Sequence, residues 1–156
     1  MTDKHRRNFI KRSLCLLAAF TTGMTGLLKP LIAFAARNSQ AFAAETEKNA
    51  LAALFPGQVV EASNAIQIDV RDVIENGAVV PLSIITKLSA VESITILVEK
   101  NPNPVIAKFN FEPGCSGFIA TRIKVAQPSD IIAIVQSRGK LYSARKFIEV
   151  ITGGCG

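Results

Sequence analysis

A cysteine one residue from the end of the chain is the side chain best suited to chemistry. The last five residues are Thr152, Gly153, Gly154, Cys155 and Gly156. A cysteine thiolate is the nucleophile in exchange and sulfur-transfer reactions, while glycine adds backbone freedom and no bulk. Five residues span at most ~16 Å at ~3.3 Å each. The pattern therefore predicts a thin, flexible tether that carries a thiol and could enter a narrow channel.

Simpler interpretations of this terminus stay open. Chain ends are often disordered, and Cys155 would then be incidental; alternatively, Cys155 forms a structural disulfide. A second thiol, Cys115, lies in the turn-like segment 112–117. No spacing rule decides whether Cys115 pairs with Cys155, is buried or is a free surface thiol. The third cysteine, Cys15, lies in an apolar stretch near the N-terminus, and we expect it to be removed with that stretch.

The remaining composition excludes several classes of function. The only histidine is His5, so Ser-His-Asp catalysis, Cys-His catalysis and histidine-ligated zinc are excluded for the rest of the chain. The 156 residues carry a formal charge of +6, but residues 1–43 hold seven Lys and Arg against one acid, so the remainder is neutral. A neutral remainder lacks the basic surface that binds a phosphate backbone. We expect no cofactor, no metal site and no nucleic-acid partner.

The N-terminal segment has the features of an export signal. Arg6 and Arg7 are adjacent and a Phe follows two residues on, which resembles the twin-arginine signal. The apolar stretch 13–28 is shorter than the ~20 residues that span a membrane, so we expect a removable signal rather than a permanent anchor. Because the charge composition changes there, we predict cleavage after Ala43, and Ala35 ends the rival small-x-small site. The mature protein is expected in the periplasm, exported folded, where disulfides are permitted.

Hydropathy patterns in the rest of the chain predict a short helix followed by strands. Residues 45–55 show helical spacing of apolar side chains, and Pro56-Gly57 stops that helix. The segments that follow alternate with a period of two, or form a short continuous apolar run. The expected strands are residues 66–70, 93–98, 107–111, 119–125, 131–135 and 141–151. We predict a mainly β fold, an antiparallel immunoglobulin-like β-sandwich over residues 44–151, with a flexible arm at residues 152–156.

Several segments together carry a family resemblance. Residues 75–84 contain Asn-Gly-Ala-Val-Val-Pro, residues 101–104 are Asn-Pro-Asn-Pro, and residues 118–124 contain Thr-Arg-Ile-Lys. The chain ends in Gly-Gly-Cys-Gly and begins with a twin-arginine leader. In this order the segments resemble the SoxY family of sulfur-oxidation carrier subunits. That family usually ends in Gly-Gly-Cys-Gly-Gly, so this chain has one glycine fewer after its cysteine.

The resemblance implies a carrier rather than an enzyme. In that family the terminal cysteine, which Cys155 matches, holds thiosulfate-derived sulfur covalently while partner enzymes act on it. The implied partners are a SoxZ-like β-sandwich subunit in a heterodimer, a SoxAX-type cytochrome, a SoxB-type hydrolase and, in some systems, a sulfane dehydrogenase. The missing glycine brings the terminal carboxylate closer to the sulfur of Cys155, and a nearby anion disfavours the thiolate. Cys115 is not expected as a family residue.

A function of another class fits the same residues. An exported structural β-sandwich would use its terminal cysteine for a permanent disulfide to a partner, and scattered carboxylates leave an enzyme as a third, weaker hypothesis. Five cations are candidates for steering acidic partners or shielding an anionic cargo, although solvation of strand faces is the simpler interpretation. They are Arg122, Lys124, Lys140, Arg145 and Lys146.

The export assignment predicts the effect of a conservative change in the leader. Replacing Arg6 and Arg7 by lysine keeps the charge but removes the twin-arginine pair, so we expect export to be blocked. Immunoblots of periplasmic and cytoplasmic fractions measure this, with the wild-type leader as control. Export at the wild-type level after both replacements would refute the assignment.

Overall fold

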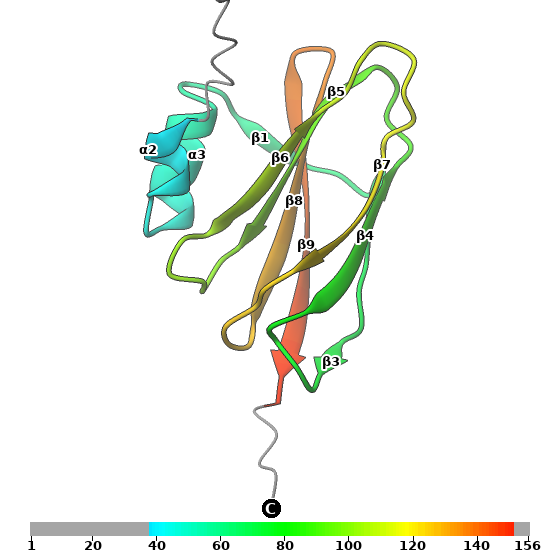
Figure 1. The fold of residues 1–156 in the computed structure, drawn as a ribbon. Coiled ribbons are helices and arrows are strands. Elements are labelled where there is room, and N and C mark those ends of the chain that lie inside the picture. Colours follow the sequence, from blue (N-terminus) through cyan, green and yellow to red (C-terminus); the bar gives the residue numbers. More distant parts are fainter. Residues whose placement is uncertain (1–37, 152–156) are drawn as a thin grey trace, which may run out of the picture. The chain divides into compact units, whose positions relative to one another are not determined.

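The computed structural model describes residues 38–151 and forms a β-sandwich with two helices packed against one of its sheets (Figure 1). A six-stranded sheet and a three-stranded sheet face one another across the core. The prediction of a mainly β, immunoglobulin-like sandwich preceded by a short helix is confirmed. In chain order the elements are α2 (Ser39–Phe42), α3 (Glu47–Leu54), β1 (Val60–Ala62), β2 (Ile66–Asp69), β3 (Val73–Ile74), β4 (Val80–Thr86), β5 (Val91–Val98), β6 (Val105–Asn110), β7 (Phe118–Ile123), β8 (Ser129–Ser137) and β9 (Lys140–Val150).

The helix expected over residues 45–55 is α3, and local signals set both of its ends. The Thr46 hydroxyl oxygen accepts a hydrogen bond from the Asn49 N–H (3.2 Å) and so caps the first turn. After the helix, Gly57 has φ +71°, a left-handed conformation that glycine adopts without steric cost, and the chain turns away. Phe55 is buried against the outer face of the six-stranded sheet. Among the described residues, no helix is long and apolar enough to cross a membrane.

The last strand, β9, organises the six-stranded sheet. Its hairpin with β8 continues antiparallel to β5 and then β6. On its other side β9 pairs with two short strands, β1 near its beginning and β3 at its end, and both run parallel to it. Between them the chain crosses to the second sheet as β2, which pairs antiparallel with β4, and β4 with β7. Beside the predicted antiparallel pairing, the structure adds these two short parallel pairs, because β1 and β3 reach the free edge of β9 on the way to and from the second sheet.

The centre of the six-stranded sheet is buried on both faces. Its inner face, which includes Ile94 and Ile131, packs against the small sheet, and its outer face, which includes Leu97 and Ile132, packs under the helices. The apolar run at residues 131–135 is buried on both sides, as expected. The alternation of apolar and polar residues in β5 predicts that only one face of this strand is buried. In the structure its outer face is buried as well, because the helices cover it.

The central strand of the small sheet, β4, is not among the strands that the pattern predicts. It contains Pro81, and proline lacks the N–H that a central strand donates. The sheet accommodates Pro81 because β2 pairs only with residues 83–86 of β4, so that Pro81 has one neighbouring strand, β7. The strands β1 and β3, with three and two residues, are too short to show a period of two.

The helix α2 lies on the leader side of the cleavage site predicted after Ala43. Ala41 is fully buried, and Phe42 packs against the same apolar cluster as α3. The side-chain amide of Asn38 donates a hydrogen bond to the Ala53 carbonyl oxygen (2.8 Å), which fastens α2 to α3. Cleavage after Ala43 would remove all of these contacts. The packing of α2 therefore favours a cleavage site before Asn38.

We expect the mature protein to begin after Ala35, the earlier of the two small-x-small sites. A chain that begins at Ala44 loses the buried contacts of Ala41 and Phe42, which should lower its free energy of unfolding by about 1–3 kcal/mol. Intact-mass measurement on protein from its source cells identifies the first residue, and thermal unfolding compares chains that begin at residues 36 and 44. A mature chain beginning at Ala44, or equal Tm values for the two chains, would contradict this expectation.

Candidate functional site

The residues that sequence analysis assigns to sulfur chemistry and to export lie outside residues 38–151. They are Arg6, Arg7, Gly153, Gly154, Cys155 and Gly156. The structure describes the base from which the terminal segment, residues 152–156, departs. That base consists of the end of β9 as far as Ile151 and the segments packed around it.

The end of β9 is held by β3 and the residues before it. The strand β8 pairs with β9 only as far as Ile148, so the last residues of β9 depend on their other neighbour. The Ile151 N–H donates to the Ile74 carbonyl oxygen (2.8 Å), and the Glu149 N–H donates to that of Asp72 (2.7 Å). Further back on β9, the Lys146 ammonium forms an ion pair with the Asp72 carboxylate (3.0 Å). Backbone and side-chain bonds thus fix the point at which the terminal segment begins.

Gly77 lies against this base and leaves no room for a side chain. A Cβ atom built there would stand 2.2 Å from the Val125 carbonyl oxygen and 3.1 Å from a methyl group of Val150. The same close approach lets the Val125 N–H donate to the Gly77 carbonyl oxygen (2.8 Å). Residues 75–84, one of the resemblance segments, therefore join the end of β7 to the end of β9.

Asn101, the first residue of the Asn-Pro-Asn-Pro turn, clamps the segment that follows β7. Its side-chain amide donates to the Lys124 carbonyl oxygen (2.8 Å), and its side-chain oxygen accepts from the Ala126 N–H (2.9 Å). Only 9% of Asn101 is exposed, and a buried amide with both of its functions satisfied orders the backbone around it. The resemblance segments 75–84, 101–104 and 118–124 therefore all meet near the end of β9.

Cys115, the cysteine of the described domain, lies away from this base. Cys115 is exposed and free in the loop between β6 and β7, at the opposite end of the sandwich from the end of β9 (Figure 1). Strand β7, which follows this loop, rises about 17 Å over its five steps at 3.3 Å each before it reaches the end of the sandwich where β9 finishes. Cys115 is therefore not a neighbour of the base from which the terminal segment departs.

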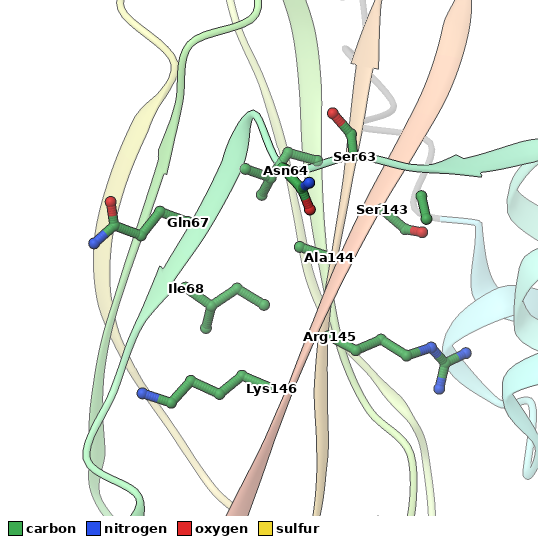
Figure 2. A pocket seen from close by; sticks show the side chains of 10 residues that line it. Ser63, Asn64, Gln67, Ile68, Ser143, Ala144, Arg145 and Lys146 are labelled. Atoms are coloured by element: carbon green, nitrogen blue, oxygen red, sulfur yellow. The ribbon is translucent and has the colours of Figure 1, made fainter.

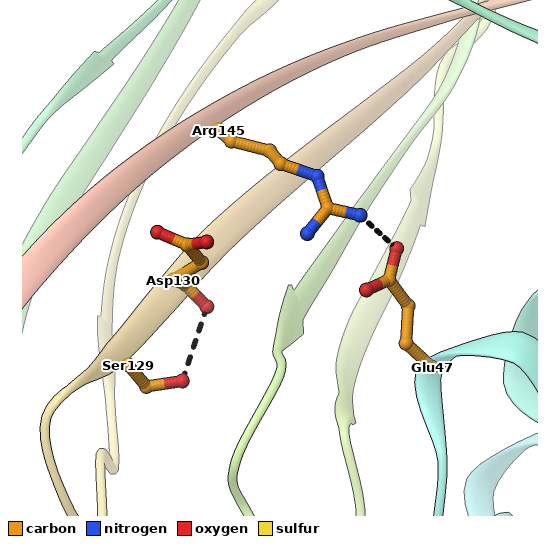
Figure 3. A network of polar contacts seen from close by, with 4 residues as sticks. All are labelled: Glu47, Ser129, Asp130 and Arg145. Carbon is orange, nitrogen blue, oxygen red and sulfur yellow. Dashed lines mark hydrogen bonds and ion pairs between the residues drawn. The ribbon is translucent and has the colours of Figure 1, made fainter.

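The five candidate cations do not gather at one site. Arg145 reaches toward α3 and pairs with Glu47 (Figure 3), Lys146 pairs with Asp72, and Lys140 begins β9 at its other end. Arg122 belongs to β7, and Lys124 directly follows that strand. A groove of about 630 Å³ runs between β2 and β9 past Arg145 and Lys146, whose side chains point apart (Figure 2). Solvation and local ion pairs account for these cations, and the described residues contain no cluster of three or more His, Cys, Asp or Glu that could hold a metal ion.

Comparison with known proteins identifies the family. Residues 51–155, which include Cys155, match the family model described as sulfur oxidation protein SoxY. The chain belongs to the SoxY family. The solved structure of the sulfur carrier protein SoxY from Chlorobium limicola f thiosulfatophilum is 33% identical in sequence; the match covers 70% of this chain and 96% of that one, with a TM-score of 0.64. No curated protein matches the chain.

Membership of the SoxY family confirms the resemblance that the sequence segments indicate. Within this SoxY domain, Gly77 and Asn101 build the base of the terminal segment, a role that the pattern alone does not assign. A signal for each is present in the sequence, because Asn-Gly and Asn-Pro pairs are typical of tight turns. The ion pair between Lys146 and Asp72 has no such signal, since only pairing of β3 with β9 brings the two residues together.

The close approach at Gly77 predicts a stability effect. Gly77→Ala forces a methyl group against the Val125 carbonyl, so we expect a loss of about 1–3 kcal/mol and a Tm lower by roughly 5–15 °C. Ala120→Ser, on the exposed face of β7, is the control and should change stability by less than about 0.5 kcal/mol. Thermal unfolding monitored by circular dichroism measures both. A wild-type Tm for Gly77→Ala would show that the base tolerates a side chain there.

Proposed function

We propose that this SoxY protein is a carrier without catalytic activity of its own, which holds thiosulfate-derived sulfur on Cys155 while partner enzymes oxidise and hydrolyse it. The observation that carries the proposal is the extent of the family match, because residues 51–155 take in the terminal Gly-Gly-Cys together with the folded domain. The relative from Chlorobium limicola is itself described as a sulfur carrier. The hydrogen bonds that hold the chain up to Ile151 support a short arm with a fixed base.

A carrier of this kind needs a thiol that forms a sulfur–sulfur bond and later gives it up. The Cys155 thiolate and thiosulfate join as Cys–S–S–SO₃⁻ and release two electrons, which a SoxAX-type cytochrome would accept. Water then cleaves the bond to the sulfonate sulfur, giving Cys–S–SH and hydrogen sulfate, which is the step of a SoxB-type hydrolase. A sulfane dehydrogenase would oxidise the remaining sulfur in systems that contain one. The thiol is the only group that this chain supplies to the bonds that change.

The partner that would accompany the carrier throughout is a SoxZ-like β-sandwich subunit. In the described part of the chain, β6 forms one edge of the larger sheet. A free edge strand presents unpaired backbone groups that readily pair with another chain. Both the family membership and this edge support a stable heterodimer.

The place of action that we propose is the periplasm. The adjacent Arg6 and Arg7 and the short apolar stretch behind them support export by the twin-arginine route, with removal of the leader and no permanent membrane anchor. That route carries folded chains. The sandwich would then form before export and meet its enzymes in a compartment where sulfur–sulfur bonds persist.

Loss of the thiol should abolish function and leave the fold intact. Cys155→Ser is expected to stop thiosulfate-dependent turnover in a reconstituted system, because a serine hydroxyl is scarcely ionised near neutral pH and forms no sulfur–sulfur bond. Its Tm should equal that of the wild type, since the residue lies beyond the last strand. Cytochrome reduction and sulfate release measure turnover, and Cys115→Ser, which removes the other thiol, is the matched control and should retain it.

The tether can be tested apart from the thiol. Replacing Gly153 and Gly154 together by valine keeps Cys155 but stiffens and widens the segment, and it should also impair turnover. Full activity of Cys155→Ser would end the carrier proposal. A large fall in its Tm, together with a stoichiometric disulfide to another protein, would instead support the structural β-sandwich.

A further inference from the structure

Three exposed apolar side chains lie together at the end of β9. In the described part of the chain, seven large apolar side chains are between 42% and 80% exposed, and this group comprises Val73 (47%), Phe147 (57%) and Ile151 (48%). Val73 lies opposite Glu149 in the parallel pair of β3 with β9, and Phe147 and Ile151 lie two residues to either side of Glu149. Residues two apart on a strand share a face, so all four side chains belong to the outer face of the sheet. We call Val73, Phe147 and Ile151 the exit patch.

The helices leave the exit patch uncovered. On this face α2 and α3 cover the beginning of β9, where Leu141 is buried beneath them. The ion pair of Arg145 with Glu47 marks the rim of that cover (Figure 3). Phe147 is the next residue of β9 on the same face, and its cross-strand neighbour is Asp130 of β8. Single exposed apolar residues are ordinary, whereas a group of them calls for a partner.

The exit patch has an acidic rim. Two carboxylates stand beside it on the same face: Asp130 is the cross-strand neighbour of Phe147, and Glu149 lies opposite Val73. The cations of β9 do not neutralise this rim, because Arg145 is paired with Glu47, while Lys146 points to the other side of the strand (Figure 2) and is paired with Asp72. The surface that complements the exit patch is therefore apolar at its centre and basic around it.

We infer that the exit patch is the docking surface for the enzyme that acts on the sulfur group carried by Cys155, an inference that rests on the proposed function. Ile151 belongs to the patch and directly precedes the terminal segment, in which the residues up to Cys155 span at most about 14 Å. An active site that takes in Cys155 must bring its entrance within that distance of Ile151, and the exit patch is the exposed apolar surface that such an entrance would meet beside Ile151. An active site for an anionic sulfonate is itself basic, which matches the acidic rim.

A chemically loaded carrier tests this docking without a loading enzyme. In a Cys115→Ser background Cys155 is the only thiol of the mature chain, whichever of the two small-x-small sites is cleaved. Its thiolate attacks a central sulfur of tetrathionate, forms Cys–S–S–SO₃⁻ and expels thiosulfate, so that no external oxidant is required. The loaded carrier is then given to a SoxB-type hydrolase, and initial rates of sulfate release are measured over a range of carrier concentrations to obtain kcat and KM.

A pair of phenylalanines separates docking from general effects. Phe147→Ser removes the centre of the exit patch and should raise KM about 10-fold while kcat stays within about twofold, because Phe147 supplies no group to the bonds that change. Phe118→Ser is the matched control, since Phe118 is 50% exposed and begins β7 at the opposite end of the sandwich. Phe118→Ser should leave both constants unchanged, and Phe147→Leu should keep KM near the wild-type value.

A pair of glutamates tests the acidic rim. Glu149→Lys places a cation within the exit patch and should raise KM about 10-fold, with the difference shrinking at high salt. Glu61→Lys makes the same change on β1, at the other end of β9, where Glu61 is exposed and pairs in register with Tyr142. We expect a wild-type KM for Glu61→Lys. Equal effects of the two changes would point to net charge and overturn the role of the rim.

Several outcomes would overturn the docking surface. One is an unchanged KM for Phe147→Ser; another is an equal rise for Phe118→Ser. Loss of the heterodimer by Phe147→Ser in size-exclusion chromatography would also overturn it, because the SoxZ-like subunit would then occupy the patch. If Phe147→Ser does not fold, Ile151→Ser replaces it. Failure of the proposed function is distinguishable: Cys155→Ser would still release sulfate from thiosulfate, whereas failure of docking alone leaves Cys155 required.

Discussion

The pairing of β9 on both of its sides is the constraint on which the rest of the structure depends. The strand β8 reaches only as far as Ile148, and beyond that point β3 alone supplies the hydrogen-bond partners that hold the chain to Ile151. A terminal strand without β3 would present unpaired backbone groups and fray. Gly77 and Asn101 also help to hold this region. Gly77 allows its turn to pack closely against Val150, and Asn101 holds the segment after β7 that packs against Gly77.

The two faces of the six-stranded sheet differ in how far they are covered by the rest of the domain. The inner face is covered along its length by the small sheet, and the helices cover the outer face only around the first half of β9. The uncovered remainder exposes Val73, Phe147 and Ile151, although burying apolar area is the main favourable term in folding. A third helix packed across this region would bury these side chains and stabilise the domain, but it would obstruct access to the base of the terminal segment.

This SoxY domain keeps its chemistry apart from its fold. The segments that identify the family, residues 75–84, 101–104 and 118–124, act structurally and converge on the end of β9. The thiol that we propose as the attachment site, Cys155, follows the last described strand in the sequence and belongs to none of these segments. Such a separation suits a carrier, whose cargo should react only inside a partner's active site.

The sequence by itself determined the elements whose signals are local. The cap and stop of α3, the period-two strands and the doubly buried run at residues 131–135 all follow from the steric and solvation preferences of neighbouring residues. Tertiary structure alone decided the parallel pairing of β1 and β3, the place of Pro81 in β4, and the distance between Cys115 and the end of β9. Each of these depends on which segments, far apart in the chain, share an edge of a sheet. Residue patterns do not encode that choice locally, because backbone hydrogen bonds are alike at every position and only the closing of the whole core selects among them.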